Sequence, residues 1–220
     1  MHREKRQAMF REIDLYPVTC EKLSAGRSDL EVLEAVIRGG SRIIQLREKE
    51  LSTRSLYQLA LRFREVTARA GVLLIINDRI DVAMAVDADG VHLGQDDLPL
   101  RAARTLAPNL LIGASTHSLE EALRAQEEGA DYVNIGPIFP TSTKTCTTPF
   151  LGPAAIEAIV PHLKVPFTIM GGINSSNLEE VLARGARRVA VVTAVTQAPD
   201  IAAAVSDLRS RILHFPSQSK

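Results

Sequence analysis

The octapeptides GADYVNIG, residues 129–136, and GARRVAVV, residues 185–192, resemble each other, and each places an apolar run shortly after a glycine. A glycine at such a point typically ends a helix, and the β-branched run that follows is typical of a strand. The pair therefore predicts a repeated unit in which a helix leads into a strand.

Apolar runs of this kind recur eight times along the chain. They are continuously apolar rather than alternating, which is typical of parallel strands buried on both faces. The predicted strands are residues 15–19, 43–46, 73–76, 90–93, 111–114, 132–135, 167–170 and 189–192.

The segments between these runs have helical periodicity. In Ser52–Ala70 the apolar residues form one stripe, and Gly71 follows as a stop signal. Ser118 and Ser176 each precede a glutamate at capping-box spacing, which predicts a helix start at both positions.

Eight strand–helix units in 220 residues predict an α/β protein with one domain, a (β/α)₈ TIM barrel over residues 12–213. The alternative is an open doubly wound sheet, which usually carries a glycine-rich loop after its first strand. Here Cys20-Glu21-Lys22-Leu23 follows that strand, which favours the barrel. Both ends, residues 1–11 and 214–220, are predicted to be flexible tails.

Composition excludes several classes of function. Lys plus Arg equals Asp plus Glu at 26 each, which argues against a generic nucleic-acid or anionic-membrane binder. The two cysteines show no zinc-ligand or disulfide-framework spacing, so a reducing cytoplasm is the expected location. No run approaches the roughly 18 apolar residues of a membrane span.

Polar residues collect where the second predicted strand ends. Alternation along the chain turns Gln45, Arg47 and Lys49 to the same side. Two cations and an amide suit a polyphosphate or a polar ring, although an ordinary charged loop has the same composition.

Carboxylates end the next two strands. Asp78 follows the third strand, and Asp96 or Asp97 follows the fourth. Each alone is typical of a helix N-cap, but the two together beside a cationic strand end favour a Mg²⁺ site completed by water and substrate phosphate.

The remaining strand ends carry phosphate-binding residue types. Ser115 follows the fifth strand, and the long connection over residues 136–152 contains Thr141, Thr143 and Lys144. That connection is read either as an active-site lid or as a mobile surface loop. Gly171-Gly172 ends the seventh strand, where many barrels bind phosphate, although a tight turn needs the same glycines.

These clusters imply two anion sites, and hence two phosphorylated substrates or one substrate phosphorylated at both ends. His92 and His117 are expected to orient or pack rather than to act as bases. No Ser/His/Asp order or nucleophile elbow is present.

The motifs resemble those of the thiamine-phosphate synthase family, in order and in spacing, from Leu15 to about Val195. The matching segments are QLREK (45–49), IINDR (75–79), GVHLGQDD (90–97), GAST-H (113–117), IGPIFPTSTK (135–144) and GGI (171–173). The resemblance implies a transferase that joins 4-amino-2-methyl-5-(diphosphooxymethyl)pyrimidine to a thiazole phosphate and releases pyrophosphate without a protein nucleophile.

The resemblance also implies roles for residues. Asp78 and Asp97 would bind Mg²⁺, and Arg47, Lys49, Ser115 and Lys144 would act in catalysis. The pyrimidine diphosphate would be held by Gln45, Leu46, Arg47, Glu48, Lys49, Asn77, Ser115 and Lys144. The thiazole phosphate would be held by Thr141, Thr143, Gly172, Val192 and Thr193, and Ser142 would also bind substrate.

Thr193 stands where the family usually has serine, but the hydroxyl is retained. Two alternatives remain open: a thiazole tautomerase of the same fold, and a non-catalytic phosphate-binding barrel. The full cationic and carboxylate set favours the synthase. A homodimer is implied by the resemblance alone.

Overall fold

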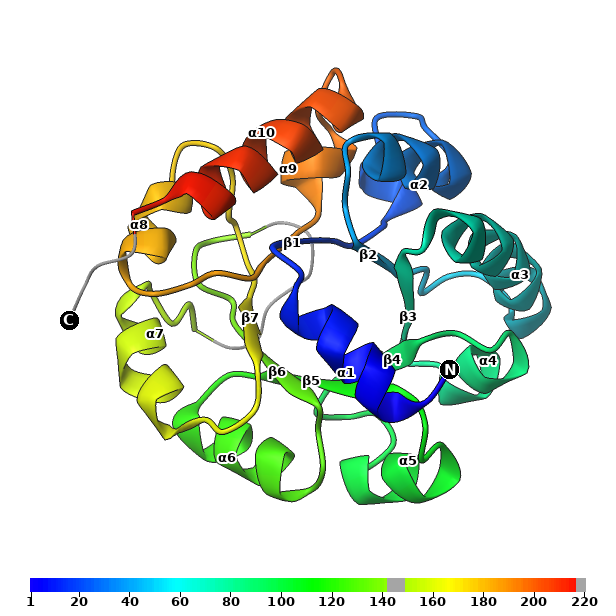
Figure 1. The fold of residues 1–220 in the computed structure, drawn as a ribbon, viewed down its shortest axis with the longest axis horizontal. Helices are drawn as coiled ribbons and strands as arrows, with labels where there is room; N and C mark the ends of the chain where they lie inside the picture. Colours follow the sequence, from blue (N-terminus) through cyan, green and yellow to red (C-terminus); the bar gives the residue numbers. More distant parts are fainter. Residues whose placement is uncertain (142–148, 217–220) are drawn as a thin grey trace.

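The structure is a computed structural model that describes residues 1–141 and 149–216 (Figure 1). Eight parallel strands pair in the order β1-β8-β7-β6-β5-β4-β3-β2. The strands are β1 (Leu15–Pro17), β2 (Ile43–Leu46), β3 (Leu73–Asn77), β4 (Gly90–Leu93), β5 (Leu111–Thr116), β6 (Tyr132–Ile135), β7 (Phe167–Ile169) and β8 (Val189–Val191).

A parallel bridge between Val18 and Gln45, with the Thr19 N–H donating to the Gln45 carbonyl at 2.9 Å, joins β1 to β2. The sheet therefore closes into the predicted (β/α)₈ barrel, with the helices ringed around it (Figure 1). The outer helices are α2 (Asp29–Arg38), α3 (Thr53–Ala70), α4 (Ile80–Ala85), α5 (Leu100–Leu106), α6 (Leu119–Glu127), α7 (Ala154–Ile159), α8 (Leu178–Ala183) and α10 (Ile201–His214). Short turns are η1 (Glu21–Leu23), η2 (Val160–His162) and the four-residue helix α9 (Thr193–Thr196).

Local signals placed most of the boundaries. Helix α3 begins after Ser52, whose side chain accepts from the Ser55 N–H, and ends at Gly71 with φ +68°. The cap at Ser118 is also confirmed. The one predicted at Ser176 is wrong, because helix α8 begins after Asn177 and the Ser176 N–H donates to Asn174 instead.

Buried residues form two main layers. The larger lies between the strands and the outer helices and includes Leu46. The second fills the inside of the barrel, with Phe10, Tyr16, Ile75 and Tyr132 among its members. At the carboxyl ends of the strands, polar side chains such as Gln45, Asn77 and Ser115 replace the apolar ones and line an open cavity.

The predicted amino-terminal tail is not a tail. Residues Arg3–Arg11 form helix α1, which lies across the amino ends of the strands (Figure 1). Its Phe10 is 1% exposed and enters the barrel. The sequence did not predict this helix, because only Arg6 and Phe10 are buried and the rest of the segment has the charged composition of a solvent-exposed tail.

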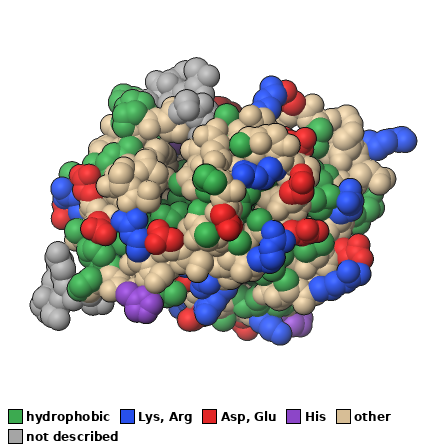
Figure 2. All heavy atoms as spheres, turned by 90° about the horizontal axis from the view of Figure 1, so that it is seen from above, with side chains coloured by type: hydrophobic (Ala, Val, Ile, Leu, Met, Phe, Trp, Pro, Cys, Tyr) green, Lys and Arg blue, Asp and Glu red, His purple; other side chains and the backbone are tan. Residues whose placement is uncertain are grey.

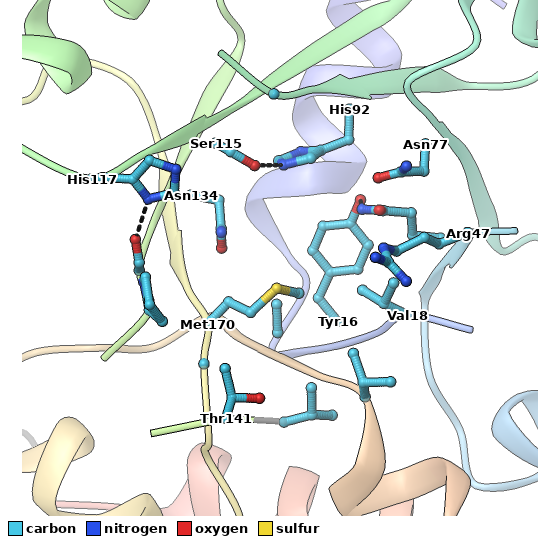
Figure 3. Close-up of a pocket in the computed structure, with 18 of the residues that line it drawn as sticks. Tyr16, Val18, Arg47, Asn77, His92, Ser115, His117, Asn134, Thr141 and Met170 are labelled. Carbon is cyan, nitrogen blue, oxygen red and sulfur yellow. Dashed lines mark hydrogen bonds between the residues drawn. The ribbon is translucent and has the colours of Figure 1, made fainter. Parts of the chain in front are cut away.

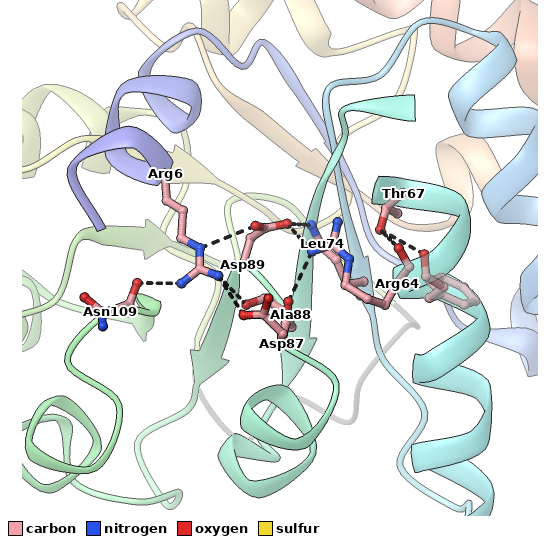
Figure 4. Close-up of polar contacts among 9 residues, drawn as sticks. Arg6, Arg64, Thr67, Leu74, Asp87, Ala88, Asp89 and Asn109 are labelled. Carbon is pink, nitrogen blue, oxygen red and sulfur yellow. Dashed lines mark hydrogen bonds and ion pairs between the residues drawn. The ribbon is translucent and has the colours of Figure 1, made fainter. Parts of the chain in front are cut away.

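A buried ion network holds α1 in place (Figure 4). Arg6, 2% exposed, donates to the Asn109 carbonyl at 2.7 Å and to the carboxylates of Asp87 and Asp89. Asp89 also accepts from Arg64 at 2.7 Å and from the Leu74 N–H. The buried charges are therefore paired and hydrogen-bonded, as burial requires.

The carboxy-terminal prediction is tested only in part. His214 ends helix α10 rather than beginning a tail, and residues 217–220 lie outside the described part. On the face drawn in Figure 2, acidic and basic side chains are interspersed. Within the described ranges, no helix combines the length and the apolar character needed to cross a membrane.

Candidate active site

A cavity of about 400 Å³ opens at the carboxyl ends of the strands. It draws side chains from every strand end, although these residues are spread from β1 to β8 in sequence. The predicted site residues that line it are Gln45, Arg47, Lys49, Asn77, Asp78, Asp97, Ser115, Thr141, Gly172, Val192 and Thr193.

One half of the cavity carries charge. Lys49 Nζ lies 2.9 Å from Asp78 Oδ2, so a cation after β2 meets a carboxylate after β3. Asp78 has φ +59°, a left-handed backbone that a non-glycine residue rarely adopts. Such strain is typical of functional sites, and Asp78 lines the cavity.

Asp97 is the carboxylate that meets Asp78. Its Oδ2 accepts from the Gly94 N–H at 2.6 Å, which fixes the turn after β4. Burial raises the pKa of Asp97, and hydrogen bonding and repulsion from Asp78 raise it further. Asp96 lies exposed on the same turn and also lines the cavity, but the carboxylate that contacts Asp78 is that of Asp97.

The two carboxylates fit a hard divalent cation. Their oxygens share one locality, and a dication there would relieve their mutual repulsion. Among the described residues, no group of three or more His, Cys, Asp or Glu side chains is arranged to hold a metal. A metal at this place would therefore take its other ligands from water and from phosphate.

The opposite half is built from backbone. Gly171 and Gly172 have φ +108° and +63° and pack against the segment after β6. A Cβ on Gly172 would lie 2.3 Å from the Pro140 carbonyl oxygen, so only glycine fits. Val192 and Thr193 begin α9 on the neighbouring strand end.

A chain of hydrogen bonds forms the cavity floor. Gln45 Nε2 donates to the Tyr16 hydroxyl at 2.9 Å, and that hydroxyl lies 3.0 Å from the Tyr132 hydroxyl. The Tyr132 hydroxyl lies 3.1 Å from His92 Nδ1, and His92 Nε2 lies 2.9 Å from Ser115 Oγ (Figure 3).

Burial fixes the protonation of this floor. It lowers the pKa of His92 to about 4, against an opposing effect of Asp78. It raises the pKa of Tyr16 and of Tyr132 well above the ordinary tyrosine value. The imidazole is therefore neutral and both phenols are protonated at neutral pH.

Two predicted binding residues do not reach the cavity. Leu46 is 1% exposed and packs in the outer core, because alternation turns it away from Gln45 and Arg47. The Glu48 carboxylate accepts from the Glu21 N–H at 2.8 Å. Burial, together with the negative charge of Glu48, raises the pKa of Asp29 to about 8. Both residues therefore stabilise the structure around the end of β2 and do not line the cavity.

Ser142, Thr143 and Lys144 lie outside the described residues, so their predicted roles stay predictions. The described ends of that connection pair with each other. The Leu151 N–H donates to the Pro137 carbonyl at 2.9 Å, and the Gly152 N–H donates to the Ile138 carbonyl.

Sequence reasoning missed several lining residues: Tyr16, Val18, Asn134 and Met170. Asn134 carried a usable signal, since it is a lone amide inside an apolar strand, two residues after Tyr132. Figure 3 shows Asn134 turned toward the same space as His92 and Ser115. His117, predicted to be structural, has its Nδ1 at the Gly136 carbonyl and its N–H on Glu121.

Comparisons with known proteins agree with one another. The family model described as thiamine monophosphate synthase matches residues 15–195. The chain is 50% identical over 198 residues to the thiamine-phosphate synthase of Chloroflexus aurantiacus, covering 90% of this chain and 92% of that protein. It is 45% identical over 201 residues to that of Methanospirillum hungatei, covering 91% and 98%.

Solved structures give the same picture. Thiamine phosphate pyrophosphorylase from Pyrococcus furiosus matches with a TM-score of 0.84 at 40% identity, covering 91% of this chain and 96% of that one. A 3-hexulose-6-phosphate synthase matches with a TM-score of 0.62 at 18% identity, covering 90% and 99%, and shares the fold alone.

Proposed function

The chain belongs to the thiamine-phosphate synthase family of transferases, and we propose that its cavity carries out the family's reaction with the residues described above. That reaction joins 4-amino-2-methyl-5-(diphosphooxymethyl)pyrimidine to 4-methyl-5-(2-phosphoethyl)thiazole. Thiamine phosphate and pyrophosphate are the products.

One observation carries the assignment of residues. A single cavity joins a charged half, with Arg47, Lys49 and two carboxylates, to a glycine half at β7 and β8. Two phosphorylated substrates can therefore meet over a neutral floor. A tautomerase, which takes one monophosphate, has no use for the charged half.

The charged half is proposed to bind the diphosphate. Arg47 and Lys49 supply the positive charge that a departing pyrophosphate needs, and Asn77 and Ser115 supply neutral donors. Lys49 is already held by Asp78 at 2.9 Å, so its position is set before the substrate arrives.

Mg²⁺ is proposed to bind at Asp78 and Asp97. When bound, it would neutralise charge on the leaving diphosphate. The two carboxylates fit it by their hard oxygen donors and by the repulsion that raises the pKa of Asp97.

The chemistry is proposed to be dissociative. Pyrophosphate leaves first, the pyrimidine amino group stabilises the resulting cation, and the thiazole nitrogen then attacks. No nucleophile on the protein is required, so the residues act by positioning, by stabilising the leaving group and by excluding water. Among described lining residues, Ser115 has its oxygen bonded to a neutral His92, without a carboxylate partner to make a triad.

The thiazole phosphate is proposed to bind at the glycine half. Gly172 lets phosphate approach the backbone, and Thr193 offers its hydroxyl beside it. Thr141 lines the same side. Ser142 and Thr143 are proposed to add contacts from the same connection, whereas Lys144 is proposed to contact the pyrimidine diphosphate.

Pyrophosphate release with both substrates, with and without Mg²⁺, tests the function. We expect release only when both substrates and Mg²⁺ are present. Isomerisation of a thiazole carboxylate phosphate without pyrophosphate release would favour the tautomerase instead. The cytoplasmic location and the homodimer also remain proposals, and a sedimentation measurement gives the oligomeric state.

Lys49→Ala is expected to weaken pyrimidine diphosphate binding about 10- to 100-fold, because a charge-assisted contact to phosphate is lost. Isothermal titration calorimetry with that substrate alone measures the change. Lys22→Ala is the matched control, since Lys22 pairs with Glu50 on the surface. Unchanged affinity in Lys49→Ala would remove Lys49 from the diphosphate site.

Gly172→Ala is expected to weaken thiazole phosphate binding about tenfold and pyrimidine diphosphate binding much less. A Cβ there would both strain φ +63° and push on the Pro140 carbonyl at 2.3 Å. Gly71→Ala has similar strain at φ +68° with nothing within 4 Å, so it separates strain from contact. Equal losses for both substrates would contradict the division into two halves.

A further inference from the structure

Five side chains inside the barrel are linked end to end by hydrogen bonds of 2.9 to 3.1 Å. We name them the lumen chain; in order they are Gln45, Tyr16, Tyr132, His92 and Ser115. Gln45, Tyr16, His92 and Ser115 line the cavity, and Figure 3 shows Tyr16, His92 and Ser115 around it. The proposed diphosphate contacts do not include Tyr16, Tyr132 or His92, so the proposed function leaves these three residues without a role.

The barrel is shaped around this chain. Gly113 sits in the middle of β5, where glycine normally weakens a strand. A Cβ there would lie 2.1 Å from Tyr132 Cζ, 2.3 Å from its hydroxyl oxygen and 2.6 Å from His92 Nδ1. Glycine at this position therefore leaves room for the bond between the tyrosine and the imidazole.

The direction of every proton in the chain follows from its first bond. Gln45 Nε2 donates to Tyr16, so the Tyr16 proton goes to Tyr132. The Tyr132 proton then goes to His92 Nδ1. As long as Gln45 Nε2 donates to Tyr16, any other arrangement leaves a buried hydroxyl proton without an acceptor, which is costly.

The far end is fixed in the same way. An imidazole whose Nδ1 accepts from the Tyr132 hydroxyl has no proton on that nitrogen and carries its proton on Nε2. His92 Nε2–H therefore donates to Ser115 Oγ, and the Ser115 proton is left to point into the cavity. In this state Ser115 is a donor, which suits a phosphate oxygen.

We propose that the lumen chain is a proton-ordering relay, in which the amide orientation of Gln45 sets whether Ser115 donates to the substrate. This inference rests on the proposed function and adds to it Tyr16, Tyr132 and His92 as positioning residues. If the Gln45 amide is turned over, so that its oxygen faces Tyr16, the direction of every hydrogen bond in the chain reverses. Ser115 then donates its proton to His92 instead of to the substrate.

The relay gives the site a substrate preference. When Gln45 Nε2 donates to Tyr16, its carbonyl oxygen is free to accept from a ligand N–H. The amino group on the pyrimidine ring is such a donor, whereas an exocyclic carbonyl oxygen in the place of that amino group is an acceptor. Binding of an aminopyrimidine therefore favours the state in which Ser115 donates to the diphosphate.

The decisive test follows the His92 proton by ¹⁵N NMR of histidine-labelled protein, with His92→Gln to assign the signals. The wild-type protein with pyrimidine diphosphate alone is expected to carry the proton on Nε2. At a pH at which the carboxylate of Gln45→Glu is ionised, the side chain can only accept, so Tyr16 donates to it and the His92 proton moves to Nδ1. Tyr132→Phe in the Gln45→Glu background is expected to abolish that transmitted shift.

Turnover supplies an independent readout. Tyr132→Phe keeps the ring that stacks on Phe10 at 4.1 Å and removes only the hydroxyl. We expect kcat for pyrophosphate release to fall about tenfold, with KM for the thiazole phosphate unchanged. Tyr57→Phe, on the outer helix α3, is the matched control and should keep wild-type kinetics.

The two proposals fail separately. If wild-type protein turns over but Gln45→Glu leaves the His92 proton on Nε2, the relay is overturned and the function stands. If no pyrophosphate is released by the wild type while the His92 proton still responds to Gln45→Glu, the relay stands and the function falls.

Discussion

Asp97→Asn is expected to lower the turnover number for Mg²⁺-dependent pyrophosphate release by about 100-fold or more, which corresponds to about 2.7 kcal/mol of barrier. Asparagine is isosteric and keeps an oxygen that can accept from the Gly94 N–H, so the turn after β4 should survive. The loss therefore reports the carboxylate charge beside Asp78. Initial rates at increasing Mg²⁺ measure it, and excess Mg²⁺ should restore part of the activity.

The neighbouring carboxylate is the comparison for this variant. Asp96 is exposed on the same turn, so Asp96→Asn should stay within about threefold of wild type. Near-normal kinetics for Asp97→Asn over the same range of Mg²⁺ would remove the proposed metal site. A large loss in Asp96→Asn alone would move that site by one residue.

Strand positions were predictable because the physics is local. A parallel strand buried on both faces must be continuously apolar, so β2, β4 and β6 were predicted with their observed bounds. Barrel closure then brought Arg47, Asp78 and Gly172 to one cavity, although they are far apart in sequence. The topology supplied the proximity that spacing alone does not show.

Other features depend on contacts that no local pattern encodes. Leu46 and Glu48 belong to the motif QLREK at residues 45–49, yet the alternation of side chains along the strand turns both away from the cavity. Tyr16 looked like an ordinary strand residue, and only the closed barrel sets its hydroxyl beside Tyr132. The cap at Ser176 failed because Asn174 and Asn177 organise that turn instead.

Phe10→Ala is expected to destabilise the protein by about 3 to 5 kcal/mol, as large-to-small changes of a buried aromatic do. Phe10 is 1% exposed, stacks on Tyr132 at 4.1 Å and meets Tyr16 edge-on at 6.4 Å. Its loss leaves a void at the amino end of the barrel. The melting temperature should fall by roughly 6 to 20 °C for a chain of this size.

Phe150→Ala serves as the control, because that ring is 48% exposed and its truncation should change the melting temperature by about two degrees at most. Arg6→Ala should also destabilise, since it leaves Asp89 with one fewer cation in a buried network. If Phe10→Ala melted with the wild type, helix α1 would contribute no stability and residues 1–11 would behave as the tail that their composition predicts. A large loss instead makes α1 a part of the barrel core, and it places Phe10 directly beneath the tyrosines of the lumen chain.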